Sequence, residues 1–314
     1  MKKIAKILSL VLVLAIFAIM AMGSGSGSSS SSSDVKTPSS VSSGGQDTEA
    51  KPAESSTSST SSAVASEVTI EEAVVFDQGG IKITAKSFNS KGTFGPEIKL
   101  LIENDSSKSV TVQSRNTSVN GYMIETMMSA DVAAGKKAND TLTLMRSDLE
   151  TAGITTIADI EFSFHIFDSE SWDTIVDSGM VRIETSAAEG FTYSYDDSGN
   201  QVYNDNGVEI VVKGLSESGS WLGPSVVVYI SNTGSRDVTV QARDVSINGF
   251  MVESIFSSDV VAGKHAIDTI TFLSSDLEAN EIETIESIEL SFHVFDMDSW
   301  DTIVDTSPVT INFN

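Results

Sequence analysis

The stretch Ile160–Asp168, with the sequence IEFSFHIFD, alternates apolar and polar side chains, and it returns as IELSFHVFD at Ile288–Asp296. Apolar side chains at every second position place one face of a strand in a core and leave the other in water. Each stretch therefore predicts a half-buried β-strand. We expect Phe164 and Phe292 to be core residues of the two copies.

The duplication extends far beyond this strand. Residues 95–184 align with residues 223–312 without a gap, and Ser171–Asp177 is identical to Ser299–Asp305. Such similarity at a fixed period means that one fold is present twice. We place a first repeat at 67–187 and a second at 188–314, and any chemistry proposed for one must be sought in the other.

Strand signals continue through each repeat, separated by turn-forming stretches such as 77–80 and 104–107. In the first repeat the further strand-like runs are 74–76, 81–85, 98–102, 110–113, 141–144 and 181–183. About seven or eight short strands at this spacing are typical of a two-sheet sandwich. The predicted class is all-β.

One segment of each repeat breaks the strand pattern. Ser147–Glu150 and its copy Ser275–Glu278 place a serine three residues before a glutamate, which is the pattern of a capping box. A single helical turn is predicted at each, and the first should end near Gly153. Because Glu281 replaces that glycine, we expect the second helix to end differently.

The N-terminus predicts export. Residues 1–23 combine three lysines with an apolar run, which is typical of a signal peptide cleaved after Gly23. If it is kept, this segment is the protein's membrane contact. Residues 24–66, rich in Ser, Gly and Thr, cannot bury a core and predict a disordered linker. The predicted location is extracellular or at the cell envelope, and the absence of cysteine excludes disulfides.

The formal net charge is -25, from 19 basic and 44 acidic residues. Nucleic acid is bound chiefly through Lys and Arg, so the charge argues against a nucleic-acid partner. Cations and basic partners remain compatible with it. The plainer interpretation is that an acidic surface keeps an extracellular protein soluble.

Four motifs together resemble a known family. They are Val119–Met123, Val132–Lys137, Ser147–Glu150 and Ile160–Asp168, each with a counterpart in the second repeat. They resemble the telokin-like, immunoglobulin-type domains of unknown function found in secreted and lipid-anchored proteins of Gram-positive bacteria. The resemblance implies two tandem immunoglobulin-like β-sandwiches in an envelope setting, and it implies no known ligand.

Carboxylates cluster after the Phe-rich strand of each repeat. The candidate ligands are Asp168, Glu170 and Asp173 in the first repeat, and Asp296, Asp298 and Asp301 in the second. Calcium takes six to eight oxygen ligands, and an exported protein meets it at millimolar concentration. The alternative is a solvated acidic turn that closes a hairpin. No other cofactor is indicated.

The three tryptophans are the other candidates. Trp172 and Trp300 lie in these acidic loops, and Trp221 lies in a Gly-rich turn. Exposed aromatic rings on one face could stack on sugars of a wall glycan. The alternative is that the rings plug the ends of the cores.

No catalytic motif is found in the chain. Zinc-binding, nucleophile-elbow and phosphate-loop patterns are absent, so we expect no enzymatic activity. The sequence favours an exported binding or adhesion module at the cell envelope that engages a protein partner. A glycan-binding module, assisted by calcium, and a passive spacer are the alternatives.

Overall fold

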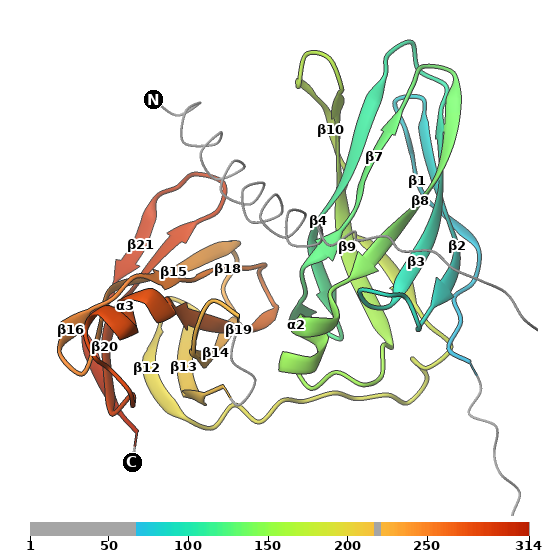
Figure 1. The fold of residues 1–314 in the computed structure, drawn as a ribbon. Helices are drawn as coiled ribbons and strands as arrows, with labels where there is room; N and C mark the ends of the chain where they lie inside the picture. The colour runs from blue at the N-terminus through green and yellow to red at the C-terminus, as the bar shows by residue number, and fades with distance from the viewer. Residues whose placement is uncertain (1–66, 217–220, 314) are drawn as a thin grey trace, which may run out of the picture. The chain divides into compact units, whose positions relative to one another are not determined.

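Antiparallel strands dominate the structure, a computed structural model that describes residues 67–216 and 221–313 (Figure 1). These residues belong to one compact unit. The predicted signal peptide, 1–23, and the predicted linker, 24–66, lie outside the described residues. Within the described ranges, no helix is both long and apolar enough to span a membrane.

The first repeat is built from two sheets. One has the order β1-β2-β3-β8-β6, and the other contains β10-β9-β4-β5, with β11 on β9 and β7 on β4. The strand bounds are β1 Ala73–Gln78, β2 Ile81–Asn89, β3 Glu97–Asn104, β4 Val110–Val119, β5 Tyr122–Met123, β6 Thr126–Met127, β7 Ser129–Val132, β8 Lys136–Leu144, β9 Asp159–Asp168, β10 Thr174–Asp177 and β11 Val181–Glu184.

The second repeat follows the same strand order. One sheet contains β12-β13-β14-β19, with β17 on β19, and the other has β16-β15-β20-β21, with β18 on β15 and β22 on β20. The bounds are β12 Asn200–Asp205, β13 Val208–Leu215, β14 Ser225–Asn232, β15 Val238–Ile247, β16 Phe250–Met251, β17 Ser254–Ile255, β18 Ser257–Val260, β19 His265–Phe272, β20 Ser287–Asp296, β21 Thr302–Asp305 and β22 Val309–Asn312.

The core of each repeat lies between its two sheets. In the first, Ile83 and Ile98 come from one sheet, and Val112, Phe162 and Phe164 come from the other. All five are almost fully buried. Burial of each such side chain stabilises the fold by about 1.5–3 kcal/mol. The all-β class is confirmed, and so are the strands that the sequence predicts in the first repeat.

The Phe-rich strands have the predicted register. Phe164 on β9 and Phe292 on β20 are each 1% exposed. Phe164 meets Phe76 and Phe162 edge to face, and Phe292 meets Phe256 in the same way. The face predicted to be buried is therefore the buried one.

Both predicted helical turns are present, but the capping box is wrong. The helix α2 spans Arg146–Thr151 and α3 spans Ser274–Ala279, and neither has a side-chain cap at its start. Ser147 Oγ donates instead to Asp148 Oδ1 at 2.9 Å. Asp148 Oδ2 in turn accepts the backbone N–H of Glu125 at 2.8 Å. Both helices therefore begin two residues earlier than a capping box at Ser147 or Ser275 predicts.

The helix ends also correct the sequence prediction. Gly153 closes α2 with a φ of 67°, and Glu281 closes α3 with a φ of 56°. Each donates its backbone N–H three residues back, to Glu150 and Glu278 respectively. The second helix therefore ends like the first, although glutamate has no easy access to this conformation.

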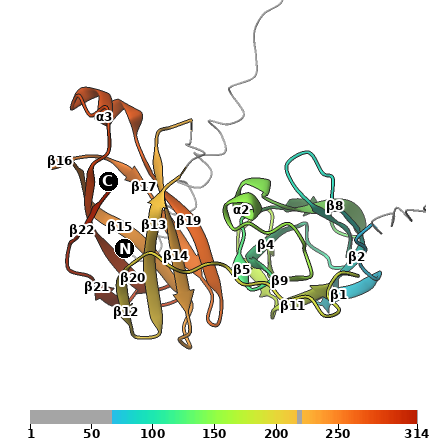
Figure 2. The same ribbon diagram turned by 90° about the horizontal axis from the view of Figure 1, so that it is seen from below.

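The two repeats contact each other through β5 and β19. His265 pairs with Tyr122 in a parallel arrangement, and its backbone N–H donates to Gly121 O at 3.0 Å. Figure 2 shows β5 on the side of the first repeat that faces β14 and β19. One sheet from each repeat is thereby joined into an 11-stranded sheet.

Candidate functional site

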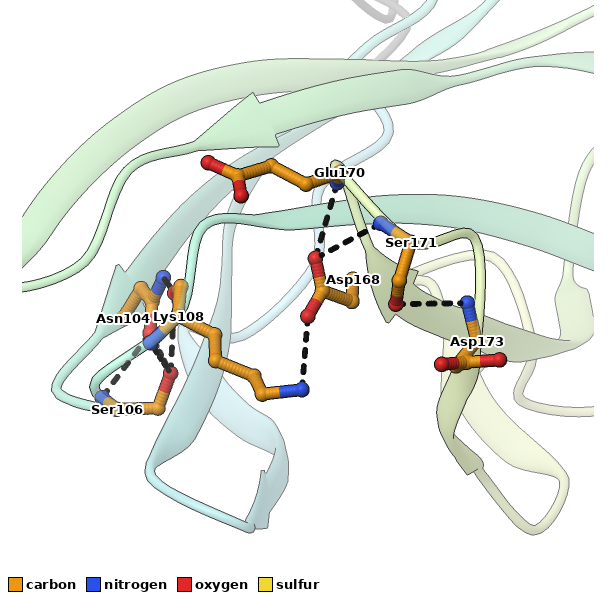
Figure 3. Close-up of polar contacts among 7 residues, drawn as sticks. All are labelled: Asn104, Ser106, Lys108, Asp168, Glu170, Ser171 and Asp173. Carbon is orange, nitrogen blue, oxygen red and sulfur yellow. Dashed lines mark hydrogen bonds and ion pairs between the residues drawn. The ribbon is translucent and has the colours of Figure 1, made fainter.

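The loop that follows β9 is organised by a single carboxylate. Asp168 Oδ1 accepts the backbone N–H groups of Glu170 and Ser171, at 2.9 and 3.3 Å (Figure 3). In the second repeat Asp296 Oδ1 accepts those of Asp298 and Ser299, both at 3.0 Å. The two loops are thus built in the same way, because an aspartate side chain can satisfy the backbone donors of a tight turn.

A cation faces the same carboxylate in both repeats. Lys108 Nζ lies 2.8 Å from Asp168 Oδ2, and Arg236 Nη1 lies 3.9 Å from Asp296 Oδ2. The hydrogen bond from Lys108, followed by that from the Glu170 N–H, lowers the pKa of Asp168 to about 2. The N–H of Ser299 is the main cause that lowers the pKa of Asp296. Both carboxylates are therefore ionised and already partnered.

The candidate calcium ligands are not gathered around one point in this loop. In Figure 3 the carboxylates of Glu170 and Asp173 point away from that of Asp168. Across residues 67–216 and 221–313, no three His, Cys, Asp or Glu side chains are placed to share a metal ion. Calcium binding by Asp168, Asp296 and their neighbours stays a prediction that the geometry does not support.

The tryptophan of each loop has an unusual backbone conformation. Trp172 has a φ of 62° and Trp300 a φ of 64°. Their backbone N–H groups donate to Asp168 O and Asp296 O, both at 2.9 Å. A bulky side chain in the left-handed region is a genuine outlier, and such strain gathers at binding sites. The turn set by the aspartate therefore forces this conformation on the tryptophan.

The two indole rings are held firmly yet exposed. The side chain of Trp172 is 70% exposed and that of Trp300 is 45% exposed. Trp172 stacks on Phe167, and Trp300 stacks on Phe295, each with ring centroids 5.5 Å apart. Both phenylalanines are buried. Each loop thus presents one exposed ring that is stacked on a buried phenylalanine and open to a ligand.

A histidine lies behind each stack. His165 packs against Phe167 and His293 against Phe295, with ring centroids 5.2 Å apart in both cases. The first is hydrogen-bonded to Asp177 and the second to Asp305. Both imidazoles are therefore engaged within their own sheets.

Trp221 belongs to a different part of the fold. It lies in the connection between β13 and β14 and is 72% exposed. Trp172 and Trp300 each stack on a phenylalanine of their own repeat. The three tryptophans therefore do not stack on one another as a single array. The alternative that these rings plug the cores is wrong for all three.

The sequence pattern did not predict the left-handed backbone conformation of Trp172 and Trp300. The signal that would have found the loop is the sequence Asp-x-x-x-Trp-Asp, in which the first aspartate can turn the chain back beneath the ring. It recurs unchanged in the second repeat at 296–301. Neither this pattern nor its recurrence shows whether the tryptophan ring is exposed or buried.

Comparisons with known proteins do not identify the chain. No family model matches it, and no curated protein matches it. Among solved structures, the YadV chaperone is 10% identical, with a TM-score of 0.21 over 69% of this chain and 92% of that one. A protein of unknown function from Porphyromonas gingivalis W83 is 11% identical, with a TM-score of 0.20 over 75% and 100%. Similarity this low carries no functional argument.

Proposed function

We propose that the protein is an exported, non-enzymatic binding module that engages a protein partner at the cell envelope. Its two repeats act as tandem immunoglobulin-like domains on the Ser-rich linker. The observation that supports this proposal is the exposed tryptophan, stacked on a buried phenylalanine, that each repeat presents, Trp172 and Trp300.

Tryptophan is suited to anchor a protein contact. It buries a large area while losing little side-chain freedom, and it is enriched among the residues that dominate binding energy. Here the ring is already fixed against Phe167 or Phe295, so little further ordering is needed on binding. The backbone strain at Trp172 and Trp300 is tolerated because the aspartate turn imposes it.

Two copies of one anchor favour a bivalent contact. If both repeats reach the same partner or two neighbouring partners, the second contact forms at high effective concentration. The strength of binding at a surface then exceeds that of either repeat. The loss of one tryptophan should therefore cost most of the avidity.

A wall glycan is the second candidate, favoured by the flat exposed face of each indole ring. A glycan-binding face needs two or three coplanar rings, whereas each of these loops presents one. A protein partner therefore fits the geometry better. A passive spacer would bind neither.

The proposal is tested by co-sedimentation of the purified protein with isolated cell envelopes. We expect saturable binding that is lost when the envelopes are stripped of protein by protease. Trp172→Ala and Trp300→Ala should each weaken binding at least tenfold, because anchor residues contribute about 2 kcal/mol or more.

Trp221→Ala is the matched control, because it removes an equally exposed tryptophan outside the repeated loop. It should leave binding unchanged. Binding that survives on protein-free wall material would favour the glycan candidate. No binding to either preparation would leave the spacer.

A further inference from the structure

The contact between the repeats defines two complementary surfaces. The docking end of the first repeat comprises Tyr122, Met123 and Glu161. The docking face of the second repeat comprises β13, β14 and β19, where Val211, Tyr229 and Ile267 join the core cluster of the first repeat.

An ion pair and an aromatic contact tie these surfaces together. Lys264 Nζ lies 2.6 Å from Glu161 Oε2, and both side chains are at most 20% exposed. The ring of His265 lies 5.2 Å from that of Tyr122 and 5.7 Å from that of Tyr229. We call this contact between the two repeats the template contact.

The second repeat has the same docking end, and it is bare. Phe250, Met251 and Ile255 are 49%, 66% and 42% exposed. Phe250 is the counterpart of Tyr122, which is only 6% exposed because the second repeat covers it. An apolar surface is thus covered in one copy of the fold and open in the other.

The counterparts of the charged pair Glu161 and Lys264 are also left over, one in each repeat. Glu289 is the counterpart of Glu161, and Lys136 is the counterpart of Lys264. Both are exposed, and among residues 67–216 and 221–313 neither forms an ion pair. Glu289 accepts a hydrogen bond from Thr310 Oγ1 at 3.2 Å. A basic edge on the first repeat is thus free to meet an acidic end on the second.

The corresponding face of the first repeat, on β2, β3 and β8, is more polar. Thr84, Leu101 and Asn139 stand where the second repeat has Val211, Tyr229 and Ile267. Contact with this face therefore buries less apolar area and is weaker than the contact within the chain. At ~0.15 M salt, charges beyond about 8 Å are screened, so the net charge does not prevent it.

We propose that a second copy of this chain docks head to tail, with the Phe250–Met251 end of one copy on the β2–β3–β8 face of the next. Glu289 of one copy pairs with Lys136 of the other, as Glu161 pairs with Lys264 within the chain. Such a heterologous contact uses different surfaces on the two copies and is repeated from copy to copy.

The test is sedimentation equilibrium of the purified protein at physiological salt over a wide range of concentration. We expect the weight-average mass to rise with concentration. Met251→Glu, Lys136→Glu and Glu289→Lys should each weaken association at least tenfold. An equimolar mixture of the Lys136→Glu and Glu289→Lys proteins should associate again, because each keeps the end that the other has lost.

Met180→Ala is the control and should leave association unchanged, since this exposed side chain lies between β10 and β11, which belong to the other sheet of the first repeat. Circular dichroism checks that every variant is folded. A monomer at all concentrations would overturn the proposal and leave the bare end to a different protein. The proposal would also be overturned if Met251→Glu abolished association and Lys136→Glu did not affect it. That result would indicate that the Phe250–Met251 ends of two copies pair with each other. Neither result bears on the envelope binding of Trp172.

Discussion

At the scale of single residues, eight non-glycine residues of the described ranges have a positive φ, and three of them are neither Asn nor Asp. Trp172, Trp300 and Glu281 have φ values of 62°, 64° and 56°. The conformation costs about 1–2 kcal/mol for a residue with a Cβ. At the tryptophans it sets an exposed ring on a buried phenylalanine. At Glu281 it ends α3, as Gly153 ends α2.

The substitution Glu281→Gly should therefore stabilise the protein. Glycine adopts a positive φ without steric cost but loses more entropy on folding, so we expect a gain of about 0.5–1 kcal/mol in the free energy of unfolding. Urea denaturation measures it. The reciprocal change Gly153→Glu should cost about 1 kcal/mol in the first repeat. If Glu281→Gly destabilises, the helix end is held by the glutamate side chain rather than by backbone geometry.

At the scale of elements, β9 and β20 supply both the core and the candidate site. Along both strands every second residue from Ile160 to Ile166 and from Ile288 to Val294 is buried, so Phe164 and Phe292 point into the cores. The aspartates that organise the exposed loops, Asp168 and Asp296, end the same strands. The register that buries the phenylalanines therefore also positions the tryptophans.

Truncation of these core rings should destabilise the repeat that carries them. Phe164→Ala and Phe292→Ala should each reduce the free energy of unfolding of their own repeat by ~3–5 kcal/mol, through lost burial and the cavity left behind. Chemical denaturation followed by tryptophan fluorescence measures this. Phe94→Ala, at a ring that is 62% exposed, is the control and should have little effect. A loss below about 1 kcal/mol at either core position would contradict the register.

At the scale of the whole molecule, carboxylates of both repeats meet where α2 packs against β19. Desolvation raises the pKa of Asp268 to about 6, with Asp148 and Asp259 adding to it, while hydrogen bonds from the Thr269 N–H and Ser258 oppose it. The folded chain therefore binds more protons than the unfolded chain between about pH 4 and 6, and its stability falls as the pH rises through this window.

Removal of one of these charges should stabilise the protein at high pH. We expect Asp268→Asn to raise Tm by about 2–4 °C at pH 8, on the order of 1 kcal/mol, and to change it little at pH 4. Thermal melts across this pH range provide the measurement. Asp140→Asn is the matched control, because Asp140 makes the same bond to the next residue's N–H, at 2.6 Å against 2.7 Å for Asp268. An equal effect of both substitutions would place its cause within a single repeat.

Local pattern alone determined much of this molecule. The all-β class, the strands and the buried phenylalanines follow from the spacing of apolar and polar residues. These features were predictable because alternation along a strand depends only on neighbouring residues. The start of α2 was not, because Asp148 bonds the distant backbone of Glu125 instead of leaving Ser147 to cap the helix.

Only the tertiary structure decided which surfaces are open. Tyr122 and Phe250 follow the same Asn-Gly turn in nearly identical sequences, yet one is 6% exposed and the other 49%. The tryptophans likewise have identical local sequences, and their exposure could not be inferred from them. The sequence by itself showed that the fold is repeated. Burial, however, depends on which residues pack against a side chain, and those residues come from segments far apart in the chain.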